Sequence, residues 1–255
     1  MNARLLFPLI CSLVLVGCGN AVSVPALLPA QDPAAQGGPP APPPTPPAAP
    51  VAGEEPLVFE GYTAAGERHS YFPLVAGSYW IYEGEDEGRV RRDEVSVLAE
   101  KRTIAGTPCT GLEQRVTLDG QLAEWTTEWF AEDPAGNVWK FGEESFEMDD
   151  GELQPSRDSW QAGTRGAMPW MLLPAAPREG DRYSGPRPGG RDDLLVVSLF
   201  AVASVPAGVF SNCLQAVENP EDEEDADILL YGGGVGLVSE SSASGRIELV
   251  EYGRR

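Results

Sequence analysis

Few residues in this chain could carry out chemistry. The sequence contains one histidine, His69, and any Ser-His-Asp or Cys-His catalytic arrangement would have to use it. The Gly-x-Ser-x-Gly motif, which presents a nucleophilic serine on a sharp turn, is missing. We therefore expect His69 to lie on the surface, and we expect no catalytic residue.

Acidic residues near positions 143–150 are the second candidate for catalysis. A pair of carboxylates acts as acid and base in glycosidases, and the 6 tryptophans of the chain could stack against sugar rings. These carboxylates surround an Asp-Asp-Gly turn at 149–151, however, and acidic residues are common in turns. A carbohydrate-active hydrolase is therefore only an alternative, with these candidate residues: Glu143, Glu144, Glu147, Asp149 and Asp150.

Metal and cofactor sites are not indicated either. One histidine and the cysteines at 109 and 213 cannot assemble a zinc site. The acidic run 218–227 lacks the Asp-x-Asp-x-Asp-Gly spacing that wraps calcium, so it predicts a solvated loop between two strands. The glycine run 231–236 does not match Gly-x-Gly-x-x-Gly, because position 237 is leucine, and it predicts a turn or bulge. We predict no metal and no cofactor.

The chain is strongly acidic. It carries 18 Lys and Arg against 39 Asp and Glu, which gives a formal net charge of −21. Phosphate backbones are bound by clusters of Lys and Arg, so nucleic acid is excluded as a partner. The same charge repels anionic lipid headgroups, although salt screens this repulsion beyond about 10 Å.

The N-terminus has the pattern of an export signal. Arg4 is followed by an apolar stretch over residues 5–17, which is the form of a secretory signal peptide. The stretch is shorter than the roughly 20 apolar residues that a transmembrane helix needs. We predict that residues 1–17 are a cleaved signal peptide and that the mature chain is extracytoplasmic.

The signal ends in Leu15-Val16-Gly17-Cys18, which resembles the lipobox of bacterial lipoproteins. The resemblance implies cleavage before Cys18, a diacylglyceryl group on its sulfur and acylation of its amine, for example with palmitate. Several acyl chains hold a protein on a membrane far better than one. Gly19 follows, which by analogy with enteric lipoproteins favours the outer membrane. An ordinary signal peptide with a chance cysteine is the alternative.

Residues 18–56 contain the lipidated cysteine and a linker. Between positions 25 and 50 the chain has 11 prolines and 7 alanines, too few apolar side chains to fold. Such a composition predicts extended polyproline II or disorder. At about 3.1 Å per residue, the linker would reach on the order of 110 Å as a stalk.

Residues 57–255 predict one all-β domain. Short runs rich in Val, Tyr, Trp and Thr alternate with polar residues and are separated by Gly, Pro, Asn and Asp. The spacing of the turns predicts a single antiparallel meandering sheet, folded as a sandwich or a partly closed barrel. Hairpins are expected around 133–137 and 243–245. The expected strands are 78–83, 94–99, 114–118, 122–131, 138–141, 194–204, 209–217, 228–231, 236–241 and 246–252.

One segment resembles a known family. Residues 129–143 read Trp-Phe-Ala-Glu-Asp-Pro-Ala-Gly-Asn-Val-Trp-Lys-Phe-Gly-Glu. This is similar to the W-[YF]-A-[QE]-D-x-x-G-N-V-W-x-[FL]-G-E signature of an uncharacterised family of bacterial secreted and lipoprotein domains. Further blocks match in order over most of residues 71–250, and the sequence departs from the family after Tyr183. The resemblance implies one all-β domain in the cell envelope and assigns no activity.

Two cysteines remain in the mature domain, Cys109 and Cys213. In an oxidising compartment two cysteines usually form one disulfide, so we expect them to be joined. Two separately buried thiols are the alternative.

These features together predict a membrane-anchored bacterial lipoprotein. Its acidic domain would be a non-catalytic binding or interaction module in the cell envelope, with an unidentified partner or ligand. A structural or assembly role in the envelope is the first alternative, and the hydrolase is the second.

Overall fold

The protein is described by a computed structural model over residues 58–66, 69–187, 190–222 and 226–255. The predicted signal peptide, Cys18 and the Pro-rich linker lie outside the described residues. This part of the chain contains 15 strands and no helix, so no helix in it could cross a membrane.

The strands confirm the all-β prediction. Every expected strand is present, and most run further than the sequence pattern indicated. The strands that were not expected are short, between 2 and 6 residues each (β1 and β7 to β10). The strands are β1 Thr63–Ala64, β2 Ser78–Asp86, β3 Arg89–Ile104, β4 Thr107–Leu118, β5 Gln121–Glu132, β6 Val138–Asp149, β7 Glu152–Pro155, β8 Trp160–Gln161, β9 Trp170–Leu173, β10 Arg182–Arg187, β11 Gly190–Val205, β12 Gly208–Glu218, β13 Asp227–Gly232, β14 Gly236–Ser241 and β15 Gly245–Arg254.

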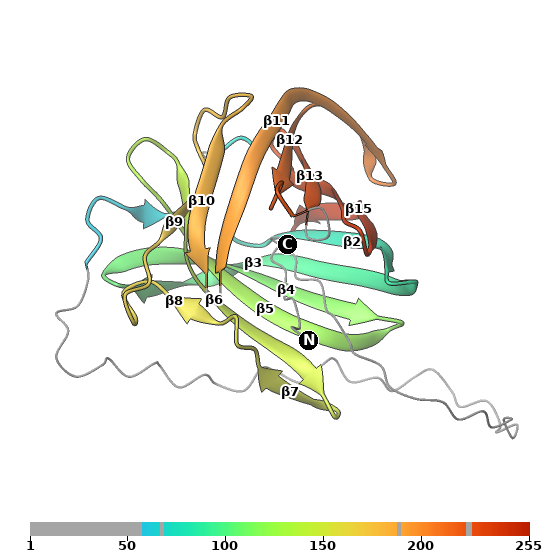
Figure 1. Cartoon of the computed structure of the whole chain (residues 1–255), viewed down its shortest axis with the longest axis horizontal. Helices are drawn as coiled ribbons and strands as arrows, with labels where there is room; N and C mark the ends of the chain where they lie inside the picture. Colours follow the sequence, from blue (N-terminus) through green and yellow to red (C-terminus); the bar gives the residue numbers. More distant parts are fainter. Residues whose placement is uncertain (1–57, 67–68, 188–189, 223–225) are drawn as a thin grey trace, which may run out of the picture.

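The strands form one antiparallel meander. The order in the sheet is β10-β11-β12-β13-β14-β15-β2-β3-β4-β5-β6-β7, so that the first long strand pairs with the last one. Both predicted hairpins, β5–β6 and β14–β15, are present. The outer edge of β6 is covered in turn by β9, β8 and β7. Figure 1 shows how strongly this single sheet curls.

The sheet is not closed by hydrogen bonds, but its two ends come close. β9, which pairs with β6, packs against β10 at the other end of the sheet. At Gly185 on β10, a Cβ atom would lie 2.1 Å from the ring of Trp170 on β9, so this approach requires glycine. Of the two architectures expected, the curled sheet is therefore nearer to the partly closed barrel than to a sandwich.

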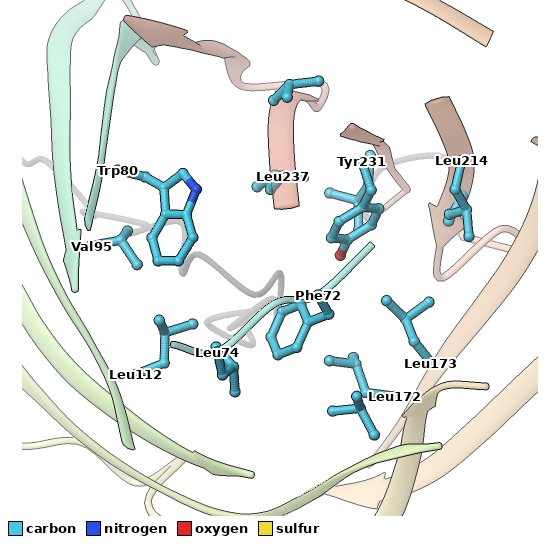
Figure 2. Close-up of a cluster of buried hydrophobic side chains, with 14 of the residues drawn as sticks. Phe72, Leu74, Trp80, Val95, Leu112, Leu172, Leu173, Leu214, Tyr231 and Leu237 are labelled. Atoms are coloured by element: carbon cyan, nitrogen blue, oxygen red, sulfur yellow. The ribbon is translucent and has the colours of Figure 1, made fainter. Parts of the chain in front are cut away.

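The main core lies on the concave side of the sheet. It gathers apolar side chains from β2 to β6 and from β9 to β15. The segment before β2 also contributes, because Phe72 and Leu74 lie among these side chains rather than outside the sheet (Figure 2). Trp80, Tyr231 and Leu214 approach them from three strands (Figure 2). The concave side is therefore filled by the chain itself.

A second, smaller cluster lies on the convex side. Successive residues of a strand point to opposite faces, and Phe130 belongs to the concave core. Its neighbour Trp129 therefore faces the convex side, where it packs with Ile104, Cys109 and Phe141. The residues before β1 and around β8 cover this cluster.

The expected disulfide is not present in the structure. Cys109 and Cys213 are both buried free thiols. Cys109 belongs to the convex cluster on β4, whereas Cys213 belongs to the concave core on β12. These strands are not neighbours in the sheet, so the two sulfurs are packed into different apolar environments.

Candidate functional site

Part of the concave side is lined by charged and polar side chains in place of apolar ones. Alternate residues of a strand share a face, so Glu128, Thr126 and Glu124 on β5 point to the same side as Phe130 of the core. All three polar side chains are buried. The hydroxyl of Thr126 donates a hydrogen bond of 2.6 Å to Glu124 and lies 2.9 Å from the hydroxyl of Ser145. Burying polar groups of this kind costs free energy of folding unless each group has a hydrogen-bond or ion-pair partner. The partners of these side chains therefore determine the role of this region.

Lys140 is the first cation of this region. Its ammonium Nζ donates to Glu128 Oε1 and to Glu143 Oε2, each at 2.6 Å, and all three side chains are almost fully buried. Burial would lower the pKa of Lys140, but the two carboxylates outweigh it and raise that pKa. Burial raises the pKa of both acids, that of Glu143 to about 8. One ammonium group is thus shared between two buried carboxyl groups.

Arg91 on β3 is the second cation. Its Nε and Nη2 atoms each donate a 2.9 Å hydrogen bond to Asp93, and both side chains are buried. Gln114 on β4 donates a further bond of 3.0 Å to the same carboxylate. A two-pronged guanidinium–carboxylate pair is among the strongest ion pairs in proteins. The pair lies within β3, and the hydrogen bond from Gln114 links it to β4.

Glu240 and Tyr231 carry polar atoms that this network leaves without a hydrogen-bond partner. Burial raises the pKa of Glu240 well above its ordinary value, and the attraction of Arg91 only partly offsets this. Asp86, Asp93 and Asp227 raise it further. Within the described residues, neither Glu240 Oε2 nor the hydroxyl of Tyr231 has a hydrogen-bond partner. The burial of Glu240 therefore favours the protonated form of its carboxyl group.

The charged network has no room for a substrate. Its side chains are buried by the sheet and by the segment that carries Phe72 and Leu74. No group of three or more His, Cys, Asp or Glu side chains in the described ranges is arranged to hold a metal ion. The hydrogen bonds of this network link β5 to β6 and β3 to β4.

A small apolar pocket opens beside the core. Its volume is about 30 Å³, and its lining includes Phe72, Leu74, Trp80 and Leu237. A water molecule needs roughly 10–15 Å³ by this measure, so the pocket takes only a very small group. All six tryptophans are buried or half-buried, and none forms an exposed platform for sugars.

His69 is buried, and the expectation that it lies on the surface was wrong. It is only 2% exposed, its Nε2 donates a 2.8 Å hydrogen bond to the carbonyl of Pro174, and its Nδ1 accepts one from the backbone of Tyr71. Burial lowers the pKa of His69, which keeps the ring neutral. The histidine thus positions the segment that enters the core.

The candidate hydrolase carboxylates do not converge on a cleft. Glu143 points to the concave side and pairs with Lys140, whereas its neighbour Glu144 faces the convex side and pairs with Arg102. Glu147 accepts a hydrogen bond of 2.9 Å from a serine hydroxyl. Asp149 and Asp150 lie at the exposed turn between β6 and β7, as the sequence predicted.

Residues 129–143, where the sequence resembles the signature of secreted domains, lie in the β5–β6 hairpin. The carboxylate of Asp133 accepts hydrogen bonds from the backbone of Ala135, from the backbone and side chain of Asn137 and from Trp139 Nε1, at 2.7 to 3.0 Å. At Gly142, a Cβ would lie 2.8 Å from a carbonyl oxygen of β8, so only glycine fits. The signature residues therefore have structural roles in this chain.

Two further predictions agree with the structure. The glycine run forms the turn between β13 and β14, with a bulge in their pairing at Leu230–Tyr231. The acidic run connects β12 to β13, and residues 223–225 of it lie outside the described residues. Its first and last acidic residues, Glu218 and Asp227, lie opposite each other in the register of β12 and β13, and both side chains are buried.

The β11–β12 hairpin carries several exposed apolar side chains, including the two most exposed large apolar ones among the described residues, Phe200 and Val209. Phe200, Val202 and Val209 are 74%, 63% and 73% exposed, and we call these three residues the apolar face of the hairpin. Residues 194–217 carry no charged side chain, although the chain as a whole has a net charge of −21. The sequence analysis missed this surface, but the uncharged run was a visible signal. Exposed apolar patches on acidic, soluble surfaces mark sites of contact with other molecules.

Comparisons with known proteins give little further information. No protein-family model matches the chain, and no curated protein matches it. Among solved structures, the chain is similar to the crystal structure of a "putative lipoprotein" from Parabacteroides distasonis. The two are 16% identical with a TM-score of 0.33, over 72% of this chain and 99% of that one.

Proposed function

We propose that this chain is a lipid-anchored lipoprotein of a bacterial envelope whose all-β domain is a non-catalytic interaction module. The contact surface is the apolar face of the β11–β12 hairpin. The observation that carries this proposal is the concentration of exposed apolar side chains on an uncharged hairpin of an otherwise acidic chain.

The proposed anchor is supported by the first residues of the chain. An apolar stretch of signal-peptide length ends at Leu15-Val16-Gly17-Cys18, which matches a lipobox. The Pro-rich linker that follows suits a stalk between a membrane and a folded domain. The resemblance of residues 129–143 to secreted and lipoprotein domains agrees with the same location. By analogy with enteric lipoproteins, Gly19 favours the outer membrane.

The interaction role is supported by what the hairpin lacks. A soluble domain usually covers its exposed strands with charged side chains, and Lys on an edge strand prevents unwanted pairing. Residues 194–217 contain no charged side chain, although Asp193 and Glu218 flank this run directly. A surface kept uncharged in this way is suited to contact with an apolar partner.

The proposed absence of catalysis is supported by the polar groups themselves. Glu143 is occupied by Lys140, Glu144 is occupied by Arg102, and His69 is occupied by a backbone carbonyl. None of these groups lines the small apolar pocket. A general acid or base must reach the reacting atoms directly or through one water molecule, and these groups are enclosed by the fold.

Site-specific photo-crosslinking in living cells tests the proposed contact surface. A benzophenone amino acid is placed at Phe200, and at Val90 on β3, which is a matched control at 63% exposure. We expect adducts to another envelope molecule from Phe200 and none from Val90. Equal adducts from both positions, or none from either, would contradict the proposal.

A further inference from the structure

We propose that the partner of the apolar face is the uncharged part of a lipid bilayer interface. Phe200, Val202 and Val209 would enter the headgroup region and reach the first acyl carbons. This inference deepens the proposed function and rests on it, because it assumes that the domain is held at a membrane by the lipid on Cys18.

The pairing of the hairpin places the three side chains on one face. Along β11, Ala203 and Val205 are buried, whereas Phe200 and Val202, which precede them, are exposed and point outward. On β12, Val209 is paired with Ser204, which shares the outward face with Val202. The apolar face is thus a single surface made by both strands.

The hairpin is held in a fixed position before any contact is made. The backbone N–H of Ala207 in its turn donates a 3.0 Å hydrogen bond to Leu249 on β15. Phe210 packs against Tyr252 with ring centroids 6.2 Å apart, while Ala203 and Val205 join the concave core. Because the inner face is already docked, the outer face can bind without the entropic cost of ordering a loop.

The charge pattern favours lipid over protein. Protein interfaces that form and dissociate have a polar rim and are about as apolar as ordinary surface. Here both strands carry no charged residue over positions 194–217, and charge is what the apolar part of a membrane excludes most strongly. The carboxylate of Glu179 accepts hydrogen bonds from Ser198 and from the backbone of Leu199, so the surface without charge is the outer part of the hairpin, beyond Leu199. The hairpin also lacks the Lys and Arg that attract anionic headgroups, so its binding should not depend on salt.

The unpaired edges of β11 and β12 limit how deeply the hairpin can insert into the bilayer. β10 pairs with β11 only up to Leu195, and β13 pairs with β12 only from Leu214. Between these points neither neighbouring strand pairs with the hairpin. Exposed backbone N–H and C=O groups are not tolerated in the hydrocarbon core, so the contact is confined to the interface.

The anchor explains why three side chains are enough. A contact of this size would be weak for a free protein, just as a single acyl chain holds a protein only marginally. A linker converts the second contact into an intramolecular one at a high effective concentration. The domain would therefore rest on the bilayer by its hairpin and return to it after each release.

Fluorescence quenching in the anchored protein tests the proposal. The full chain carrying Val202→Cys, or Val90→Cys as matched control, is purified with its own lipid and labelled with an environment-sensitive maleimide dye. Val90 and Val202 are both 63% exposed, and the native cysteines of the domain are buried. The proteins are placed in phosphatidylcholine vesicles that contain a doxyl-labelled lipid quencher.

We expect the dye at position 202 to shift to the blue and to be quenched by the doxyl lipid, with no change when salt is raised. The dye at 90 should be quenched only by aqueous iodide. Adding Phe200→Asp to the Val202→Cys chain should abolish the blue shift and make the dye accessible to iodide. A dye at 202 that iodide reaches as easily as at 90 would overturn the proposal.

Two other outcomes separate the lipid from other partners and from the anchor. A dye at 202 that is shielded from iodide but is not quenched by the doxyl lipid indicates a second copy or another protein, and overturns the proposal. If neither labelled protein floats with the vesicles, the lipid anchor is absent and the proposed function itself is wrong.

Discussion

The ammonium nitrogen of Lys140 lies 2.6 Å from a carboxylate oxygen of Glu128, at a point where both side chains are buried between β5 and the concave core. An ion pair in such a place is costly to form, because both ions lose their water. Removing one partner of such a pair also costs free energy, because the other ion then remains buried without an opposite charge. The concave side of this domain therefore depends on a small number of buried charges.

Removing the ammonium should strongly destabilise the domain. We expect Lys140→Met to lower the free energy of unfolding by about 3–5 kcal/mol, because it leaves Glu128 and Glu143 without their cation. Urea unfolding followed by tryptophan fluorescence measures this change. The matched control is Arg182→Met, since Arg182 and Glu221 form an exposed pair.

The control variant should cost no more than about 1 kcal/mol, as is usual for exposed ion pairs. Replacing the acids together with the lysine, as Lys140→Met with Glu128→Gln and Glu143→Gln, should recover much of the lost stability. Equal losses for Lys140→Met and Arg182→Met would show that the buried network does not form.

The raised pKa of Glu240 should make the domain less stable as the pH rises. Its pKa is higher in the folded than in the unfolded chain, chiefly because of burial. Its contribution to stability is therefore complete below the ordinary Glu pKa of about 4.3, and is lost as the pH rises through the folded value. Thermal unfolding from about pH 5 to pH 9 measures this loss.

Glu240→Gln tests this assignment, because the amide has the same shape and cannot lose a proton. We expect its stability to fall less between pH 5 and 9 than that of the wild type. Glu100→Gln, at an exposed position on β3, should follow the wild type. The assignment fails if Glu240→Gln and Glu100→Gln have the same pH profile.

Asp133→Ala should destabilise the β5–β6 hairpin. Burial opposes ionisation of Asp133, but the hydrogen bonds from Asn137, Trp139 and Ala135 outweigh it and lower the pKa of the carboxyl. We expect a loss of about 2–3 kcal/mol, since hydrogen bonds to a charged group are worth more than neutral ones. The contribution should be present at neutral pH and disappear as the pH falls through the lowered pKa. Asp133→Asn, which keeps one acceptor oxygen, should lose less, and identical unfolding curves for both variants would contradict this account.

The positions of the long strands could be predicted from the sequence, whereas the burial of their two faces could not. Alternation and turn residues located all the long strands, because each has a period of two. The short strands β7, β8 and β9 have no such signal, since they exist only where the edge of β6 is available to pair with them.

The buried network was not predictable from alternation. On β5, the alternating residues Glu124, Thr126 and Glu128 read as a solvent face opposite Trp125 and Trp129. In the structure both faces are covered, since the curl of the sheet encloses one and the residues before β1 and around β8 pack on the other. Such enclosure depends on contacts between distant strands, which a local pattern does not contain.

The two cysteines should behave as buried thiols. Burial raises the pKa of Cys109 to about 12 and also raises that of Cys213, and a thiol is reactive only as its thiolate. We expect neither to react with a maleimide in the native protein, and both to react after unfolding without a reductant. Two unreactive sulfurs after unfolding, together with a mass two hydrogens lower, would show that the disulfide forms after all.

The central claim, that a lipid on Cys18 holds this domain at a membrane, is tested most directly by the intact mass of the mature protein from its own bacterial cells. We predict a chain that begins at Cys18 and carries a diacylglyceryl group and an amide-linked acyl chain, recovered in the membrane fraction. Cys18→Ser should leave the protein unprocessed or release it from that fraction. A wild-type protein recovered as soluble material, with the mass of an unmodified chain, would contradict the claim.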